Sequence, residues 1–481
     1  MSSRPSRAFD GDAGDALPAD TGPLGPVAVF AFLFLLVASP LMRGGNRQVA
    51  LIVLEAAALV CLAALAPRAG RIFTRLGWRE AALLVLLASP LWLAALYLLP
   101  LPTGLWETFA GRAEYTKLLA GAGIDPGGWL ALSLAPDATR VSLFAGIPLV
   151  AAFLAGYASD ADRMKLFLRV IVGMALVQIV IGLLQAAGGS QSALHFGAAG
   201  NRPFGTFANP NHFANYIAMA LAAYAWLAWI RLARTREAHA PGRRHSRGRT
   251  LALWAFGGLL LLVGILMSRS RGASLAGIPA AVLVVLLVLA LGTRFRSWRT
   301  LGVMVAAAMV VGVSIVGYEM LATRFDVDQM VLDAPKRTVQ AATTLQGAWT
   351  FWPWGAGWGT YYEVYPRFQP ADLVGTADYA HHDHAQMLFE GGAFAALLML
   401  AFAALAVNRA LALWRIAQRE RRLGREEMAC AVCGLGLLGF LLHSFVEFNM
   451  HIPANAIVAS LLAGVFLRPL PQRAAEDAAD D

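Results

Sequence analysis

Two arginine-containing motifs in the sequence have the chemistry to bind a phosphate group. The first runs from Asn201 to His212 (Asn-Arg-Pro-Phe-Gly-Thr-Phe-Ala-Asn-Pro-Asn-His) and leads directly into an apolar segment. Its Pro and Gly predict a turn, and its asparagines are typical helix caps, so backbone N–H groups point at whatever precedes the helix. Arg202 adds a permanent charge whose planar guanidinium matches phosphate oxygens. The simpler alternative is a capped helix preceded by a solvated arginine.

The second arginine motif, Ser268-Arg-Ser-Arg-Gly-Ala-Ser274, lies between two apolar runs with almost no loop. Two arginines at the end of an apolar helix are costly in free energy, so we expect them to have a functional or structural role. The small residues that begin the next helix let an anion approach closely. Snorkelling toward lipid headgroups is the alternative. It suits Arg269 better than Arg271, because Arg271 lies beside Gly272 in the tight turn.

A histidine-rich motif opens a later apolar run. It reads Ala380-His-His-Asp-His-Ala-Gln-Met-Leu-Phe-Glu-Gly-Gly392. Histidine is the side chain best suited to proton transfer near neutral pH, so we favour proton-transfer chemistry here. Structural capping is one alternative. A metal site is another, with His381, Asp383 and His384 as ligands, although the spacing of known zinc motifs is absent.

A fourth polar motif, His443-Ser-Phe-Val-Glu-Phe-Asn-Met-His451, follows another apolar run. If the helix continues through it, Glu447 and His451 lie one turn apart. We favour a polar lining or a cluster at the lipid interface over a catalytic pair.

The elements that must position these motifs are apolar segments. The chain is 58% hydrophobic and 14% charged, whereas a soluble domain is nearer half apolar and a quarter charged. The excess is gathered into runs of roughly 17–22 residues, which must be helical to cross a hydrocarbon core of about 30 Å. Candidate spans begin near Pro26, Val49, Ala81, Val141, Phe167, His212, Leu251, Gly272, Leu301, Ala385, Met428 and Ala454.

The predicted fold is therefore all-α: a polytopic integral membrane protein with about 12 transmembrane helices. The net charge of +9 indicates basic cytoplasmic loops rather than nucleic-acid binding. A cytoplasmic N-terminus places the densest Lys/Arg clusters inside, at residues 68–79, 231–249, 294–299 and 409–425. The CxxC of Cys430 and Cys433 lies in an apolar run without a second pair, which favours helix packing over zinc or redox chemistry.

This topology gives three parts and three long outer loops. Residues 1–25 form a disordered cytoplasmic tail, residues 26–467 the transmembrane domain and residues 468–481 a second cytoplasmic tail. All four polar motifs reach the outer side. The outer loops span residues 101–140, 186–211 and 317–384, and the last lies between the ninth and tenth helices.

In their order and spacing, the motifs resemble those of the O-antigen ligase and O-antigen polymerase family. Arg-Pro-Phe-Gly-Thr-Phe-Ala-Asn-Pro-Asn is followed by Ser-Arg-Gly and then by a long outer loop. That loop contains Pro353-Trp-Gly-Ala-Gly-Trp-Gly359 and closes with His-x-Asp-x-x-Gln-x-x-x-Glu-x-Gly. The resemblance covers roughly residues 202–392. It implies transfer of a glycan from undecaprenyl diphosphate to a sugar hydroxyl, by a multi-pass protein of the bacterial inner membrane with its active site at the periplasmic face.

The resemblance also implies roles for individual residues. Arg202 and Arg271 would hold the pyrophosphate of the donor, and His381 would activate the acceptor hydroxyl. His382 and His384 stand where the family often has Asn and Tyr, which leaves the acceptor contacts there open. The residues predicted to support substrate binding are Asn209, Asn211, Asp383, Glu390 and Arg269.

The chemistry of the reaction agrees with these roles. Fixed arginines and a helix N-terminus can stabilise the charge that develops on a diphosphate leaving group, without a metal or another cofactor. A neutral histidine can accept the proton of the attacking hydroxyl. A single displacement of this kind inverts the anomeric centre.

Several functions remain open at this level. The acceptor is lipid A-core for a ligase, a carrier-linked repeat for an O-antigen or exopolysaccharide polymerase, and a protein for a protein-glycosylating relative. We expect the long outer loops to read the acceptor. An anionic-solute transporter is the alternative of another class, but it predicts broken helices and mid-membrane polar groups, of which the sequence shows few. A non-catalytic scaffold is a third. The expected partners are the lipid-linked donor, the acceptor and membrane lipids, with no nucleic acid.

Overall fold

The structure is a computed structural model that describes residues 24–72, 78–125, 127–189, 192–196, 202–237, 244–292, 327–371, 373 and 375–470. Helices dominate this part of the chain, and its one sheet is a small antiparallel pair of β1 (Pro100–Pro102) and β2 (Trp129–Ala131). The all-α class predicted from the apolar runs is therefore confirmed.

Seven helical segments among the described residues are long and apolar enough to cross a bilayer. The bent pair α4 (Trp78–Leu87) and α5 (Ser89–Tyr97) would make an eighth, with a bend of 56°. The seven segments are formed by α2 (Gln48–Leu65), α8 with α9 (Pro136–Ala145, Ile147–Ala158), α10 (Ala161–Gly188), α11 (Pro210–Glu237), α13 (Arg271–Gly292), α17 (Asp383–Glu420) and α18 (Arg425–His443).

Three further apolar helices are shorter: α1 (Pro26–Leu41), α12 (Arg244–Met267) and α19 (Pro453–Leu467). Every predicted span start except one falls inside one of these helices. The exception, Leu301, lies outside the described residues. A multi-pass membrane protein is thus supported, while the total of twelve spans and the placement of the loops remain predictions.

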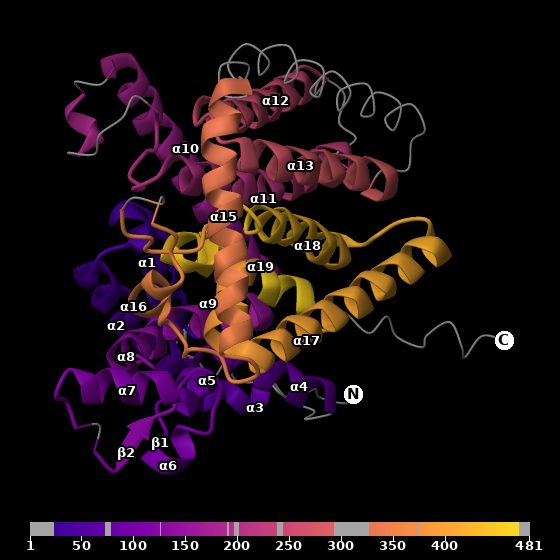
Figure 1. Ribbon diagram of the computed structural model, residues 1–481. Helices are drawn as coiled ribbons and strands as arrows, with labels where there is room; N and C mark the ends of the chain where they lie inside the picture. Colours follow the sequence, from indigo (N-terminus) through magenta and orange to yellow (C-terminus); the bar gives the residue numbers. More distant parts are fainter. Residues whose placement is uncertain are drawn as a thin grey trace, which may run out of the picture.

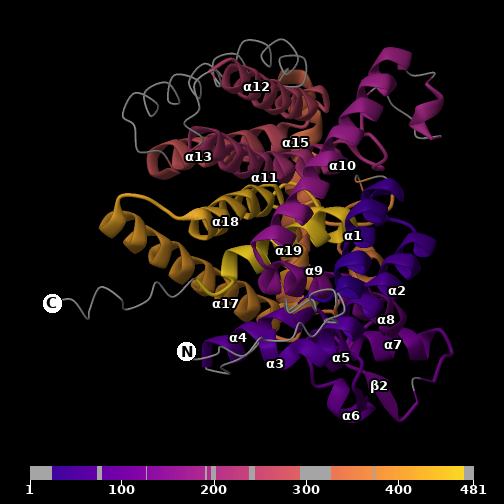
Figure 2. The same cartoon turned by 180° about the vertical axis from the view of Figure 1, so that it is seen from behind.

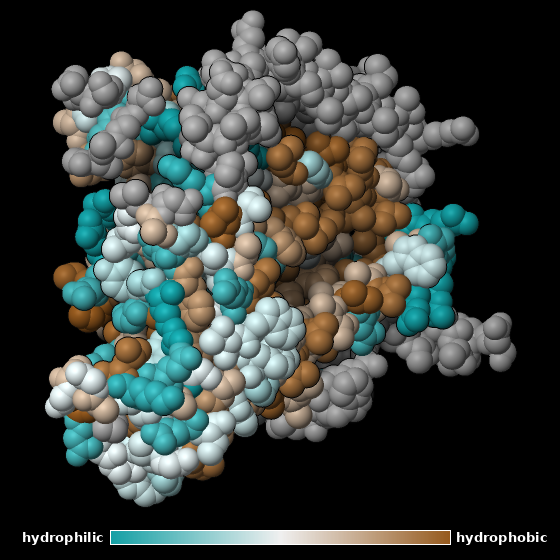
Figure 3. Space-filling model, in the orientation of Figure 1, coloured by the Kyte–Doolittle hydropathy of each residue, from teal (hydrophilic) through white to brown (hydrophobic). Residues whose placement is uncertain are grey.

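Helix α19 lies at the centre of the bundle, and most of its residues are buried. It contacts α1, α9, α11 and α18, and it is visible among them from both sides (Figures 1 and 2). Figure 3 shows apolar surface over α13, α17 and α18, and a more polar surface around α7 (Ala113–Gly121) and the two strands. This distribution is the one expected for a helical bundle in lipid.

All three predicted outer loops contain regular structure, and residues 186–211 hold the 3-10 turn η4 (Ala193–His195). Residues 101–140 hold α6 (Thr103–Trp106), α7, β2 and the start of α8. Residues 317–384 hold α15 (Val327–Thr350), α16 (Tyr361–Val364) and the 3-10 turn η5 (Tyr365–Arg367).

Helix α15 runs across α11, α13 and α18 instead of alongside them (Figure 1). Thr344 and Ala348, one turn apart, are buried on the side that packs on α17, whereas Lys336 and Arg337 are exposed. This two-sided pattern explains why the segment forms a helix although it is too polar to span a membrane.

The contact between α9 and α19 depends on two glycines. A Cβ atom at Gly156 of α9 would lie 2.3 Å from the backbone oxygen of Leu461, and one at Gly464 of α19 would lie 2.2 Å from that of Phe153. Apolar attraction between helices is weak in lipid, so close backbone packing through small residues contributes much of the association.

Replacing Gly464 with alanine therefore tests the packing of α9 on α19. We expect Gly464→Ala to force the two helices apart and destabilise the protein by about 1–3 kcal/mol. A lower apparent melting temperature of the purified protein in detergent would show this. The matched control is Gly173→Ala on α10, where no heavy atom of the described residues lies within 4 Å. Equal melting temperatures for the two variants would contradict this account of the packing.

Candidate functional site

The two arginine motifs meet in the structure. Arg202 donates from Nε and Nη2 to the backbone oxygen of Ser268, at 2.9 and 2.8 Å. Its Nη2 also contacts the backbone oxygen of Arg269 at 3.3 Å and Oδ1 of Asn211 at 3.2 Å. Asn209 completes the first motif, because its Oδ1 accepts the backbone N–H of Asn211 at 2.8 Å, at the start of α11. Arg202 thus ties the start of α11 to the break between α12 and α13.

Glu447 is the centre of the site. It lies between α18 and the 3-10 turn η6 (Asn449–His451), and its side chain is 1% exposed. His381 Nδ1 lies 3.2 Å from Oε2, and Arg337 Nη2 lies 3.0 Å from Oε1. Asn211 donates from Nδ2 to Oε1, and His212 Nε2 lies 3.8 Å from Oε2. The starts of α11 and α17, helix α15 and the end of α18 therefore converge on one carboxylate.

The charge of Glu447 is set by these neighbours. Burial alone would raise its pKa, but the hydrogen bond from His381 and the positive charge of Arg337 hold the pKa well below its usual range. A carboxylate that accepts from Nδ1 of His381 selects the tautomer in which Nε2 carries a lone pair. The His381 side chain is 31% exposed. It combines an oriented imidazole with access to solvent, as a general base requires.

Two of the predicted site residues have strained backbones. His381 has φ 49° and Arg269 has φ 52°, both in the left-handed region. This conformation costs a residue with a Cβ on the order of 1–2 kcal/mol. Such strain concentrates at functional sites, where the surrounding structure imposes it. His381 lies just before the start of α17, and Arg269 lies just before the start of α13.

Arg271 is the first residue of α13. The backbone of the next residue packs on the end of α18, since a Cβ at Gly272 would lie 2.6 Å from the ring of His443 and 2.8 Å from Val446. The start of α13 therefore lies against the segment that carries Glu447.

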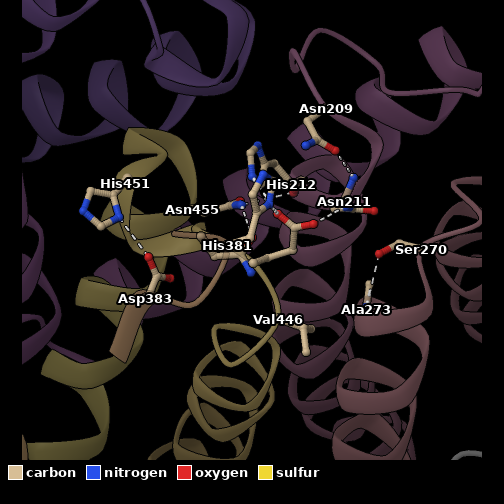
Figure 4. A network of polar contacts seen from close by, with 12 residues as sticks. Asn209, Asn211, His212, Ser270, Ala273, His381, Asp383, Val446, His451 and Asn455 are labelled. Atoms are coloured by element: carbon tan, nitrogen blue, oxygen red, sulfur yellow. Dashed lines mark hydrogen bonds and ion pairs between the residues drawn. The ribbon is translucent and has the colours of Figure 1, made fainter. Parts of the chain in front are cut away.

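Asp383 belongs to a second polar network. It accepts from His451 Nδ1 at 2.8 Å and from the backbone N–H of Met450 at 2.9 Å. Figure 4 shows His381, His212 and Asn211 pointing toward one another, with the His451–Asp383 pair to one side. Helix α18 ends at His443, so Glu447 and His451 are not one helical turn apart but serve different partners.

Glu390 lies further along α17 than Asp383, beside the bend of this helix at Gly392 (φ 50°). Its oxygens accept the backbone N–H groups of Gly359 and Tyr361 at 2.9 and 3.2 Å. The motif Pro353–Gly359 continues this junction, because a Cβ at Gly392 would lie 2.2 Å from the oxygen of Pro353. Glu390 and the glycine-rich motif together fix the first turns of α17. A contact of Glu390 or Asp383 with substrate remains a prediction.

The remaining histidines of the motif have local roles. The ring of His382 accepts the backbone N–H of Ala385 and so caps α17. Burial and the neighbouring His384 lower the pKa of His382. His384 Nε2 lies 3.3 Å from the backbone oxygen of Leu441. The proposed metal ligands His381, Asp383 and His384 thus turn to three different partners. Within the described residues, no cluster of His, Cys, Asp or Glu has the geometry to hold a metal ion.

An open cavity of about 390 Å³ lies beside His381. This volume is within the range of roughly 300–1,000 Å³ typical of ligand sites. His381 and Arg337 line it, together with Phe448, Lys336 and Gln340 of α15, Gln369, Leu373 and residues 375–379. His381 is the one predicted catalytic residue among its lining residues.

Sequence reasoning missed three members of the site. Glu447 was assigned to a polar lining, although a carboxylate at the end of an apolar run is itself a signal of function. His212 was read only as the entry to a span. Arg337 lies in a segment without a recognisable motif, and only its tertiary contact with Glu447 reveals it.

Comparison with known proteins bears on this geometry. Residues 256–400 match the family model described as O-antigen ligase, which confirms the resemblance seen in the motifs. The matched range includes Arg271, Arg337 and His381, whereas Arg202 and Glu447 lie outside it. A search of curated proteins finds no match.

The buried carboxylate generates a prediction about stability. Glu447→Ala leaves the half-buried Asn211 amide without its acceptor, so we expect a loss of roughly 1–3 kcal/mol and a lower apparent melting temperature. The exposed Glu363 of α16 provides a control, and Glu363→Ala should melt like the wild type.

The same contact predicts a pH dependence. Because folding lowers the pKa of Glu447, its stabilising contribution is fully present above the ordinary carboxyl pKa of about 4.3 and is lost progressively at lower pH. The difference in melting temperature between wild type and Glu447→Ala should therefore shrink as the pH is lowered below about 4.3. A difference that grows on acidification would show that the carboxylate is not the stabilising form.

Proposed function

Because residues 256–400 of this chain match the family model described as O-antigen ligase, we propose that the protein transfers a glycan from undecaprenyl diphosphate to a sugar hydroxyl at the periplasmic face of the inner membrane. One observation carries the proposal. His381 shares the Glu447 carboxylate with Asn211, and Asn211 also contacts Arg202. A proton acceptor and a phosphate-binding cation thus belong to one network.

The donor's diphosphate binds on the arginine side of this network. The bonds of Arg202 to Ser268 and Asn211 hold its guanidinium beside the starts of α11 and α13, whose backbone N–H groups favour anions. Arg271, as the first residue of α13, adds a second guanidinium. Together they stabilise the negative charge that develops on the leaving group.

His381 removes the proton of the acceptor. The acceptor oxygen attacks the anomeric carbon, the bond from that carbon to the diphosphate oxygen breaks, and the hydroxyl proton passes to Nε2 of His381. Glu447 holds Nδ1 and stabilises the imidazolium that results. General-base catalysis of this type contributes about 10²–10⁴-fold to the rate. The single displacement inverts the anomeric centre and proceeds without a metal.

The acceptor we favour is lipid A-core, which makes the protein an O-antigen ligase. Deletion of the gene followed by electrophoresis of envelope glycans tests this choice. A ligase deletion leaves lipid A-core without long chains while carrier-linked polymer accumulates. Single-repeat chains on lipid A-core would instead identify a polymerase. An unchanged glycan profile would contradict the proposed function.

Substitution of the three proposed catalytic residues tests the mechanism. Arg202→Ala, Arg271→Ala and His381→Ala should each reduce glycan transfer in membrane vesicles by at least about 10²-fold, because each removes charge stabilisation or the general base. Immunoblotting of membranes should show wild-type amounts of protein. Arg47→Ala is the control, since Arg47 is an exposed arginine of the predicted outer side, between α1 and α2. Activity retained in all three variants would exclude this mechanism.

A further inference from the structure

The cavity beside His381 has the chemistry of a sugar-binding site. Helix α15 contributes Lys336 and Gln340 to one wall, and the facing segment contributes Gln369, Asp378 and Tyr379. Amide, carboxylate and ammonium groups around an open cavity suit a ligand rich in hydroxyl groups, which both donate and accept hydrogen bonds.

The two amides are already oriented. Gln340 Nε2 donates to the backbone oxygen of Tyr379 at 2.8 Å, and Gln369 Nε2 donates to that of Gly375 at 2.6 Å. Each amide also carries a carbonyl oxygen, which can accept a hydrogen bond from a hydroxyl. The carboxylate of Asp378 is exposed at the same cavity.

Aromatic rings connect this cavity to the reactive imidazole. Tyr379 stacks on Phe448 with ring centroids 4.4 Å apart, and His381 meets the same ring edge-on at 4.8 Å. Phe448 therefore contacts both the imidazole and Tyr379, a lining residue of the cavity. Flat apolar ring faces of this kind also pack against the C–H face of a sugar.

The arginines proposed to bind the donor lie elsewhere. Arg202 and Arg271 are not among the residues that line the cavity. Arg202 contacts Asn211, a partner of Glu447, whereas Arg337, which contacts the same carboxylate directly, lines the cavity. The residues that line the cavity are therefore distinct from the arginines proposed to bind the donor.

We propose that this cavity is the subsite for the terminal sugar of the acceptor glycan, with Asp378, Gln340 and Gln369 binding its hydroxyl groups and presenting one of them to His381. This inference rests on the proposed transferase function. It places recognition of the acceptor on Gln340 of α15 and on Gln369 and Asp378, separate from the binding of the donor diphosphate.

The test is a comparison of Michaelis constants for the two substrates. Donor and acceptor lipid fractions are extracted from a strain that lacks the gene and are supplied to the purified, reconstituted protein. Asp378→Asn and Gln340→Ala should each raise KM for the acceptor on the order of tenfold. KM for the donor, and kcat at saturating acceptor, should stay at wild-type values.

The matched control is Gln346→Ala, which removes an exposed glutamine of α15 that does not line the cavity. Asp378→Asn changes an exposed side chain without altering its size, so its result does not depend on whether Gln340→Ala folds. Unchanged acceptor KM in Asp378→Asn, or a raised donor KM, would overturn the subsite and leave the transferase function standing. Absence of transfer by the wild type would overturn both.

Discussion

A carboxylate buried in a helical membrane protein needs matched partners, and the site depends on how Glu447 obtains them. Unpaired burial of such a charge would cost several kcal/mol. Asn211, His381 and Arg337 come from separate segments to meet it. The contacts with Glu447 therefore hold these segments together and fix the tautomer of the His381 imidazole. Since Asn211 also contacts Arg202, the carboxylate links proton chemistry to phosphate chemistry.

The position of His381 also depends on how the first turns of α17 are held in place. The glycine-rich motif Pro353–Gly359 packs its backbone directly on the bend of α17 at Gly392, and Glu390 accepts two backbone N–H groups there. Arg112, fully buried, joins this junction to the first outer segment through the backbone oxygens of Leu132 and Gly355. The motif therefore acts on the site by holding the start of α17.

The sequence alone predicted where most of the described apolar helices begin, because apolar runs, caps and helix ends are local features. It predicted helix entries beside Arg271 and His381, where α13 and α17 begin, whereas Arg202 lies in the segment that precedes α11. It did not predict which side chains meet, because the contact of His381 with Glu447 joins residues 66 apart in the chain. It described 317–384 only as a loop, since α15 is too polar to register as a span. Arg337 was missed for the same reason: its partner depends on how α15 lies across the bundle.

The central claim is that the arginines and the imidazole act on one lipid diphosphate. The most direct measurement is an experimental structure of the protein in lipid nanodiscs with undecaprenyl diphosphate. The account predicts density for the diphosphate within hydrogen-bonding distance of Arg202 and Arg271, with His381 still bound to Glu447 beside it. A diphosphate bound elsewhere, or a His381 side chain turned away from it, would contradict the account.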